Sequence, residues 1–186
     1  MSVIESTKEL APAGTWSADP VHSHVSFEVA YAGVNTFRGG FKDFSVTLTG
    51  GSEPALEGSA KVASVDVKDE NLNGHLQSPE FFDAARFPEI TFRATELRHL
   101  GGDAVEGAGE LTIKGVTQPI EITGTIASAP VTDPFGRERL GLSLQTTVDR
   151  TQYGVSWNAP NQTGGGNYVA DDVKLVAELA LVKQEA

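Results

Sequence analysis

Two histidines two residues apart, His22 and His24, are the first candidates for chemistry in this sequence. On a β-strand they point to one face, where two imidazoles could bind zinc. A zinc site needs three or four ligands, and no further histidine or carboxylate lies at a recognisable spacing, with His75 and His99 remote. We therefore expect no metal, and we expect His22 to fix the loop before the first strand. A metal-dependent enzyme that uses His22 and His24 is kept as an alternative.

Nucleophilic catalysis is not indicated either. Ser23 lies between the two histidines, but neighbouring residues on a strand point to opposite faces and make a poor nucleophile–base pair. The sequence contains no Gly-x-Ser-x-Gly motif, and without cysteine it has no thiol nucleophile and no thiolate metal ligand. The glycine run at 164–166 is a weak phosphate-loop candidate, because no Gly-Lys-Ser/Thr accompanies it. We expect no catalytic residues and a protein that is not an enzyme.

The composition narrows the partners and the location. The 186 residues carry a net charge of −11, which argues against binding to nucleic acid or to anionic membrane surfaces. No stretch of about 18 apolar residues is present, so we expect no transmembrane segment. The first residues lack a basic start followed by an apolar block, so we expect a cytoplasmic protein. The length suits one domain, which we place at 14–184 after a flexible tail at 1–13.

The elements that must position any site are mostly strands. Apolar and polar residues alternate from Val25 to Tyr31 and from Phe44 to Leu48, which is the pattern of a sheet with one buried and one wet face. Similar strands are expected at 90–97, 140–148 and 173–181, and a weaker one at 56–67. Residues 111–113 should pair with 120–122 as a hairpin across a bend at 114–117. Pro119 lacks a backbone donor and should lie at a strand start or an edge.

One stretch, His75 to Phe92, breaks this strand pattern. Ser78 can cap a helix at its start, and Pro79 suits the first helical position. Pro88 discourages helical backbone at the residue before it, so the helix should be short. It carries Phe81 and Phe82, and the polar segment before it allows a further helical turn. We expect this helix to lie over the end of the sheet.

About eight strands joined mainly by turns indicate an all-β antiparallel sandwich or barrel. The aromatic helix decides between the two folds. A sandwich seals its own core, whereas a closed barrel of about eight strands can hold a ligand, and its mouth benefits from a cover. We therefore predict an antiparallel β-barrel of about eight strands with a short helix covering one end.

Short motifs from Trp16 to Val182 resemble, in their order, those of one protein family. They are Trp16 with Asp19-Pro20-Val21-His22-Ser23, Val25-Ser26-Phe27, Gly39-Gly40-Phe41, the segments 76–83, 87–92 and 109–117, Arg150 with Tyr153-Gly154, and Asp171-Asp172-Val173. On these residues the chain resembles the YceI-like family, the polyisoprenoid-binding, lipocalin-like proteins. Two features differ from the family. Many relatives are exported, whereas we expect no export signal here. Relatives also often carry a histidine near the end of the first strand, where this chain has Tyr31.

The resemblance implies a lipocalin-like barrel whose apolar interior holds a long isoprenoid or quinone-like chain. The function expected from it is non-catalytic binding, transport or storage of such a lipid, namely a polyprenol, a polyprenyl phosphate or a quinone. This function requires no cofactor other than the bound lipid. We further expect a homodimer. A stress-linked module that binds another protein is the remaining alternative, which a fully packed interior would favour.

The candidate site follows from the inward positions of these strands and from the aromatic helix. Each apolar residue could instead be plain core, and each arginine could form a structural salt bridge. Polar groups at the rim would orient a head group, and the candidates are His22, Arg38 and Arg150. The candidate apolar lining is Val25, Phe27, Val29, Phe44, Val46, Phe81, Phe82, Phe92, Leu142, Leu144 and Trp157.

Overall fold

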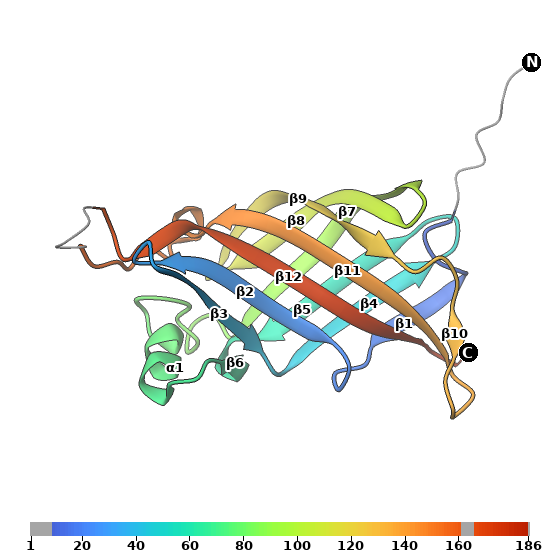
Figure 1. Ribbon diagram of the computed structural model, residues 1–186, viewed down its shortest axis with the longest axis horizontal. Coiled ribbons are helices and arrows are strands. Elements are labelled where there is room, and N and C mark those ends of the chain that lie inside the picture. The colour runs from blue at the N-terminus through green and yellow to red at the C-terminus, as the bar shows by residue number, and fades with distance from the viewer. Residues whose placement is uncertain (1–8, 161–165, 186) are drawn as a thin grey trace, which may run out of the picture.

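The computed structural model describes residues 9–160 and 166–185, which form one antiparallel β-barrel with a helix at one end (Figure 1). Two short 3₁₀ turns, η1 and η2, interrupt the strands. In chain order the elements are β1 Gly14–Ala18, β2 His24–Tyr31, β3 Asn35–Phe41, β4 Phe44–Gly50, β5 Ala55–Lys61, η1 Val62–Ser64, β6 Val65–Asp66, α1 Glu70–Gln77, β7 Glu89–Gly101, β8 Ala104–Ile113, β9 Val116–Ile126, β10 Val131–Thr132, β11 Glu138–Asp149, η2 Arg150–Tyr153 and β12 Val169–Lys183.

The barrel closes through eight strand positions, as predicted. The ring runs β11-β9-β8-β7-β5-β4-β1-β12 and returns to β11, because β11 pairs with both β9 and β12. Three further strands lie outside this ring and extend it along the barrel: β2 follows β1, β3 follows β4, and β6 follows β5. β2 pairs with the edge of β12 that β1 also uses, β3 pairs with β2, and β6 pairs with β3. The order β12-β2-β3-β6 thus repeats the order β12-β1-β4-β5 of the ring.

The hairpin of β8 and β9 is present, but its register differs from the predicted one. Lys114 and Gly115 form the whole turn, with φ values of 51° and 75°, the backbone of a two-residue type I′ turn. The pairing therefore starts at Ile113 with Val116, and 120–122 lies opposite 107–109. At Pro119, which lies opposite Glu110, β9 pairs with β8 alone and no strand pairs its other side, so the edge prediction is confirmed.

The helix lies one segment earlier than predicted. α1 begins after Asp69, whose carboxylate accepts a hydrogen bond from the Leu72 N–H at 2.9 Å. Ser78 ends the helix instead of starting one, because the following Pro79 disfavours helical backbone at Ser78. Its hydroxyl donates to the His75 carbonyl at 2.6 Å. Residues 79–87 form turns, so α1 and this loop together cover the end of the barrel (Figure 1).

The end of the barrel away from α1 is filled with side chains. Trp16, Leu48 and Leu181 are fully buried at the centre of this core. The indole N–H of Trp16 donates to the Pro12 carbonyl at 3.0 Å. Within the predicted flexible tail, Leu10 and Ala11 are buried in the same core. The described part of that segment, 9–13, is therefore packed on the barrel.

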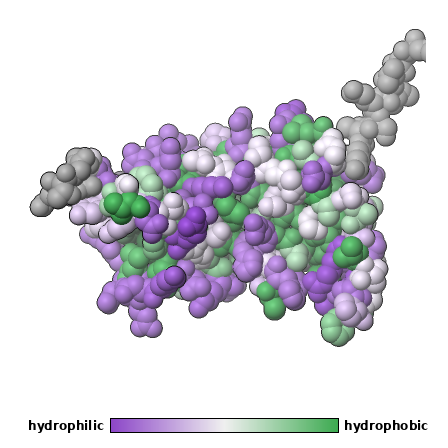
Figure 2. Space-filling view, viewed as in Figure 1, coloured by the Kyte–Doolittle hydropathy of each residue, from purple (hydrophilic) through white to green (hydrophobic). Residues whose placement is uncertain are grey.

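The outer surface is polar where the strands alternate. Figure 2 shows hydrophilic residues spread over this face of the molecule, with apolar residues between them. Among the residues that the structure describes, no helix is long and apolar enough to cross a bilayer. Two carboxylates near the packed end share one guanidinium: Arg139 donates to Asp19 and to Asp133, both at 2.8 Å. These bonds tie β11 to the loop after β1 and to the turn after β10.

We expect Arg139→Leu to lower the stability of the fold at neutral pH and to reduce its dependence on acid pH. The bond from Arg139 lowers the pKa of Asp19, and bonds from Arg137 and Arg139 lower the pKa of Asp133. Carboxyls with a lowered folded-state pKa stabilise the fold above their ordinary pKa of about 3.9, and this stabilisation is lost as the pH falls below it. The variant should therefore have a lower Tm at pH 7 and lose less on acidification.

Thermal melts at a series of pH values check this expectation. Arg93→Leu is the matched control, because Arg93 makes a surface pair with Glu110 at 3.5 Å. That control should keep the acid dependence of the parent protein. An Arg139→Leu curve parallel to that of the parent would contradict the expectation.

Candidate functional site

A cavity of about 990 Å³ occupies the half of the barrel nearest to α1. Its walls are mostly apolar side chains from strands on all sides of the barrel. Leu56, Ile122, Leu144 and Leu179 line it and also belong to the core of the packed end. These four residues form a floor, so the cavity is closed at its inner end.

Alternation along β2 supplies one wall of the cavity. Phe27 and Val29 point inward and are nearly buried. The Phe27 ring lies 6.2 Å from that of Phe37 and 6.0 Å from that of Phe41, between ring centroids. Gly39 pairs with Phe27 across the strands, and a Cβ at Gly39 would lie 2.4 Å from the Phe27 ring. Glycine at that position leaves room for the aromatic ring.

Aromatic residues gather at the mouth of the cavity. The His75 ring of α1 lies edge-on to Phe81 at 4.8 Å and to Trp157 at 5.0 Å, between centroids. His75 is hydrogen-bonded to Glu80, which holds the ring in place. Phe82 packs against Phe41 at 5.9 Å, and so joins the loop after α1 to β3. The mouth is therefore a partly apolar rim made by three separate segments.

Arg150 is a buried cation that organises the segment after β11. Its guanidinium donates to four backbone carbonyls, of Val155, Trp157, Val169 and Ala170, at 2.7 to 3.3 Å. Burial lowers the pKa of Arg150, and the nearby carboxylate of Asp171 opposes that shift. Because its donors are engaged by backbone, Arg150 positions Trp157 at the mouth.

Most of the predicted site residues come together, and a few do not. Nine of the eleven apolar candidates line the cavity, together with Arg38 and Arg150. Leu142 lies in the packed core instead, and Phe44 packs beside the cavity without lining it. Arg38 is paired with Glu28 at 3.1 Å. The nine are Val25, Phe27, Val29, Val46, Phe81, Phe82, Phe92, Leu144 and Trp157.

The histidine pair lies apart from the cavity. His22 is in the loop between β1 and β2, outside the cavity lining, and its ring is 2.7 Å from the Asp19 carboxylate. This contact fits the loop-fixing role expected from the sequence. Within residues 9–160 and 166–185 no three histidines or carboxylates are grouped so that they could hold a metal ion. The glycine run at 164–166 lies largely outside the described residues.

Several lining residues were not among the sequence candidates. Phe37 lies in a glycine-rich stretch that carried no clear strand pattern, and His75 was considered only as a metal ligand. Tyr153 lines the cavity and is 1 % exposed, and burial raises the pKa of its hydroxyl. The motif around Arg150 was the only sequence signal that marked Tyr153.

Comparison with known sequences gives a family and several relatives. A sequence model of the YceI-like domain matches residues 16–181. A UPF0312 protein of Pseudomonas putida (strain W619) is 30% identical over 141 residues, which cover 72% of this chain and 71% of that protein. A UPF0312 protein of Pseudomonas fluorescens (strain SBW25) is 29% identical over 147 residues, covering 75% and 74%.

Solved structures share the fold. BcnA of Burkholderia cenocepacia matches with a TM-score of 0.75 at 23% identity, covering 90% of this chain and 99% of that one. The YCEI protein of Campylobacter jejuni matches with a TM-score of 0.70 at 25% identity, covering 82% and 88%. A polyisoprenoid binding domain from Saccharophagus degradans matches with a TM-score of 0.65 at 13% identity, covering 91% and 98%.

Proposed function

Since the chain belongs to the YceI-like domain family, we propose that it is a non-catalytic binding protein for a long-chain isoprenoid-type lipid, held in the barrel cavity. The observation that carries this proposal is the cavity of about 990 Å³, which is floored by apolar side chains and opens beside α1. The polyisoprenoid binding domain from S. degradans, which shares the fold, supports the choice of ligand class.

The energetics of such a complex rest on the apolar lining. Removing a hydrocarbon chain from water contributes about 25 cal/mol per Å² of apolar surface, before the cost of ordering the chain. A charged or strongly hydrated ligand would lose its water inside these walls without gaining polar partners. The cavity therefore favours a hydrocarbon tail, with any polar group of the ligand near an opening.

The volume sets an approximate length for the tail. If each methylene-sized group needs about 30 Å³, the liquid volume of one water, the cavity holds on the order of 30 such groups. That number corresponds to about six isoprene units of five carbons each. We propose that a longer polyprenol or quinone tail would extend through the mouth between α1 and Trp157.

Extraction of the purified protein tests the proposal directly. We expect organic solvent to release a long-chain isoprenoid lipid that mass spectrometry identifies. Delipidated protein should take up a polyprenol or a quinone added in its place. Absence of any long-chain lipid, together with no uptake of either compound, would reject the proposed function.

A further inference from the structure

The wall of the barrel is incomplete between β9 and β11. The two strands pair only at four positions, from Ile126 with Leu142 to Thr123 with Gln145. Both strands continue well beyond this ladder, β9 back to Val116 and β11 on to Asp149. Over that length they make no pairs with each other, although every residue concerned is described.

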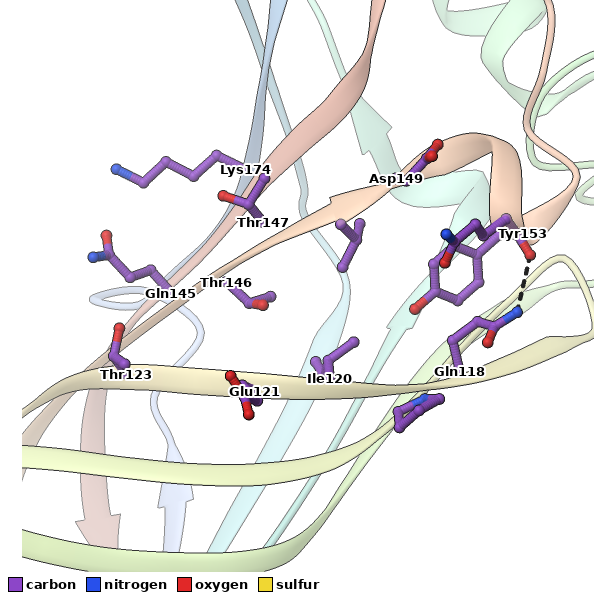
Figure 3. A pocket seen from close by; sticks show the side chains of 13 residues that line it. Gln118, Ile120, Glu121, Thr123, Gln145, Thr146, Thr147, Asp149, Tyr153 and Lys174 are labelled. Carbon is purple, nitrogen blue, oxygen red and sulfur yellow. Dashed lines mark hydrogen bonds between the residues drawn. The ribbon is translucent and has the colours of Figure 1, made fainter.

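The unpaired stretch borders an open slot of about 560 Å³. Figure 3 shows Thr123 and Gln145 where the two ribbons converge, and the Tyr153 ring at the opposite end of the space between them. The amide of Gln118 donates to the Gln152 carbonyl at 3.2 Å (Figure 3). This bond joins β9 to η2 and closes the slot at that end.

The slot and the lipid cavity share part of their walls. Five residues line both spaces, from β9, β11 and η2, so only these side chains separate the slot from the apolar interior. A molecule that occupied both spaces would therefore pass between these side chains and not through the mouth. The shared residues are Ile120, Gln145, Thr146, Val148 and Tyr153.

The Tyr153 hydroxyl is the unusual group at this boundary. It is buried, and it finds no hydrogen-bond partner within residues 9–160 and 166–185. A buried hydroxyl without a partner destabilises a fold, and such a group calls for an explanation. A ligand oxygen beside it would supply the missing bond.

The charges of the slot favour an uncharged ligand group. Its charged lining residues are Glu121, Asp149 and Lys174, two carboxylates and one ammonium. Hydrogen bonds from Thr151 lower the pKa of Asp149, which keeps that carboxylate ionised at neutral pH. Because the two carboxylates outnumber the single ammonium, the slot disfavours a phosphate or carboxylate relative to a carbonyl or hydroxyl.

We propose that this slot binds an uncharged, oxygen-bearing head group of the lipid, whose oxygen accepts a hydrogen bond from Tyr153 while the tail lies in the barrel. The inference rests on the proposed function and adds the chemical class of the head group. It selects a prenol or a quinone over a polyprenyl phosphate.

Three probes with the same tail test the inference: farnesol, farnesyl phosphate and the hydrocarbon farnesene. Binding is measured by displacement of a fluorescent apolar reporter from delipidated protein. For the parent protein we expect farnesol to bind more tightly than farnesyl phosphate. Tyr153→Phe should weaken farnesol binding about two- to tenfold, the range for loss of one hydrogen bond, and leave farnesene unchanged.

Tyr153→Phe also tests whether the Tyr153 hydroxyl makes a structural hydrogen bond in the lipid-free protein. Because the hydroxyl has no partner in the described structure, its removal should leave the Tm of the lipid-free protein unchanged or higher. A lower Tm would mean that the hydroxyl has a structural bond, and would overturn the assignment. Gln118→Ala breaks the bond to η2 and should weaken farnesol binding more than farnesene binding.

A photoreactive probe locates the head group. A farnesyl ether with a diazirine at its oxygen end should label peptides that contain Ile120, Thr146 or Val148. Labelling confined to the rim at 75–82 would place the head group at the mouth and overturn the proposal. If no probe, farnesene included, binds the parent protein, the proposed function itself fails. If all three bind but Tyr153→Phe changes none, only the slot assignment fails.

Discussion

Phe27→Arg should abolish the uptake of isoprenoid lipid while the barrel remains folded. Phe27 is 7 % exposed and lines the cavity from the middle of β2. An arginine there would place a guanidinium among apolar walls, where a tail could bind only by desolvating the charge. We expect the affinity for a polyprenol or quinone to fall by at least about 100-fold.

The matched control uses the opposite face of the same strand. Ala30 lies three residues further along β2, is exposed and is absent from the cavity lining. Ala30→Arg should therefore leave uptake unchanged. Circular dichroism and thermal melts establish that both variants fold, and Phe27→Gln gives a neutral version of the change. Full uptake by a folded Phe27→Arg variant would exclude the barrel interior as the lipid site.

Arg150→Met should be among the most destabilising single changes in the protein. The substitution keeps the apolar stem but removes the donors that serve the carbonyls of Val155, Trp157, Val169 and Ala170. Leaving buried acceptors without partners should cost about 3–5 kcal/mol. For a chain of this length the Tm should fall by roughly 6–20 °C.

Two comparisons make this result interpretable. Arg93→Met removes an exposed arginine and should change the stability by at most about 0.5 kcal/mol. Arg150→Lys keeps the charge, but one ammonium cannot reach four carbonyls in the fork geometry of a guanidinium, so we expect an intermediate loss. A Tm for Arg150→Met close to that of the parent would show that these bonds contribute little.

Arg150→Met should also change how fast the protein releases bound lipid. Arg150 holds the backbone at Trp157, whose ring packs against His75 and Phe81 at the mouth. Loss of that bond should loosen the rim before it affects the floor of the cavity. We therefore expect faster release of bound lipid below the melting transition, measured as the dissociation rate.

Local patterns in the sequence predicted most of the longer strands and an antiparallel sandwich or barrel, whereas the resemblance to the YceI-like family implied the lipocalin-like type. Alternation from Val25 to Tyr31 and from Phe44 to Leu48 needs only the two-residue period of a strand, so it can be read without neighbours. The same period separated the inward residues from the outward ones, which is why six strand residues among the nine lining candidates were found on the cavity wall. Motif order predicted the family, and the match over 16–181 confirms it.

The helix shows where local signals were ambiguous. Ser78 followed by Pro79 fits the start of a helix, yet the same pair ends one, because proline restricts the residue before it. The polar segment before this pair was expected to add only a further helical turn, and it holds the observed helix, which Asp69 caps. Leu76 and Phe81 also pack against barrel residues far away in the chain, and a local pattern does not record those contacts.

By itself, the sequence determined the all-β class and the alternation of strand faces, because these depend on neighbours within a few residues, and the order of its motifs indicated the family. The tertiary structure alone decided which candidates meet, since His22 contacts Asp19 outside the cavity and Arg150 bonds to carbonyls up to 20 residues away. It also decided where the interior is hollow and where β9 parts from β11. Those features depend on how strands distant in sequence close the ring. The periodicity of a single strand does not specify which strands become its neighbours.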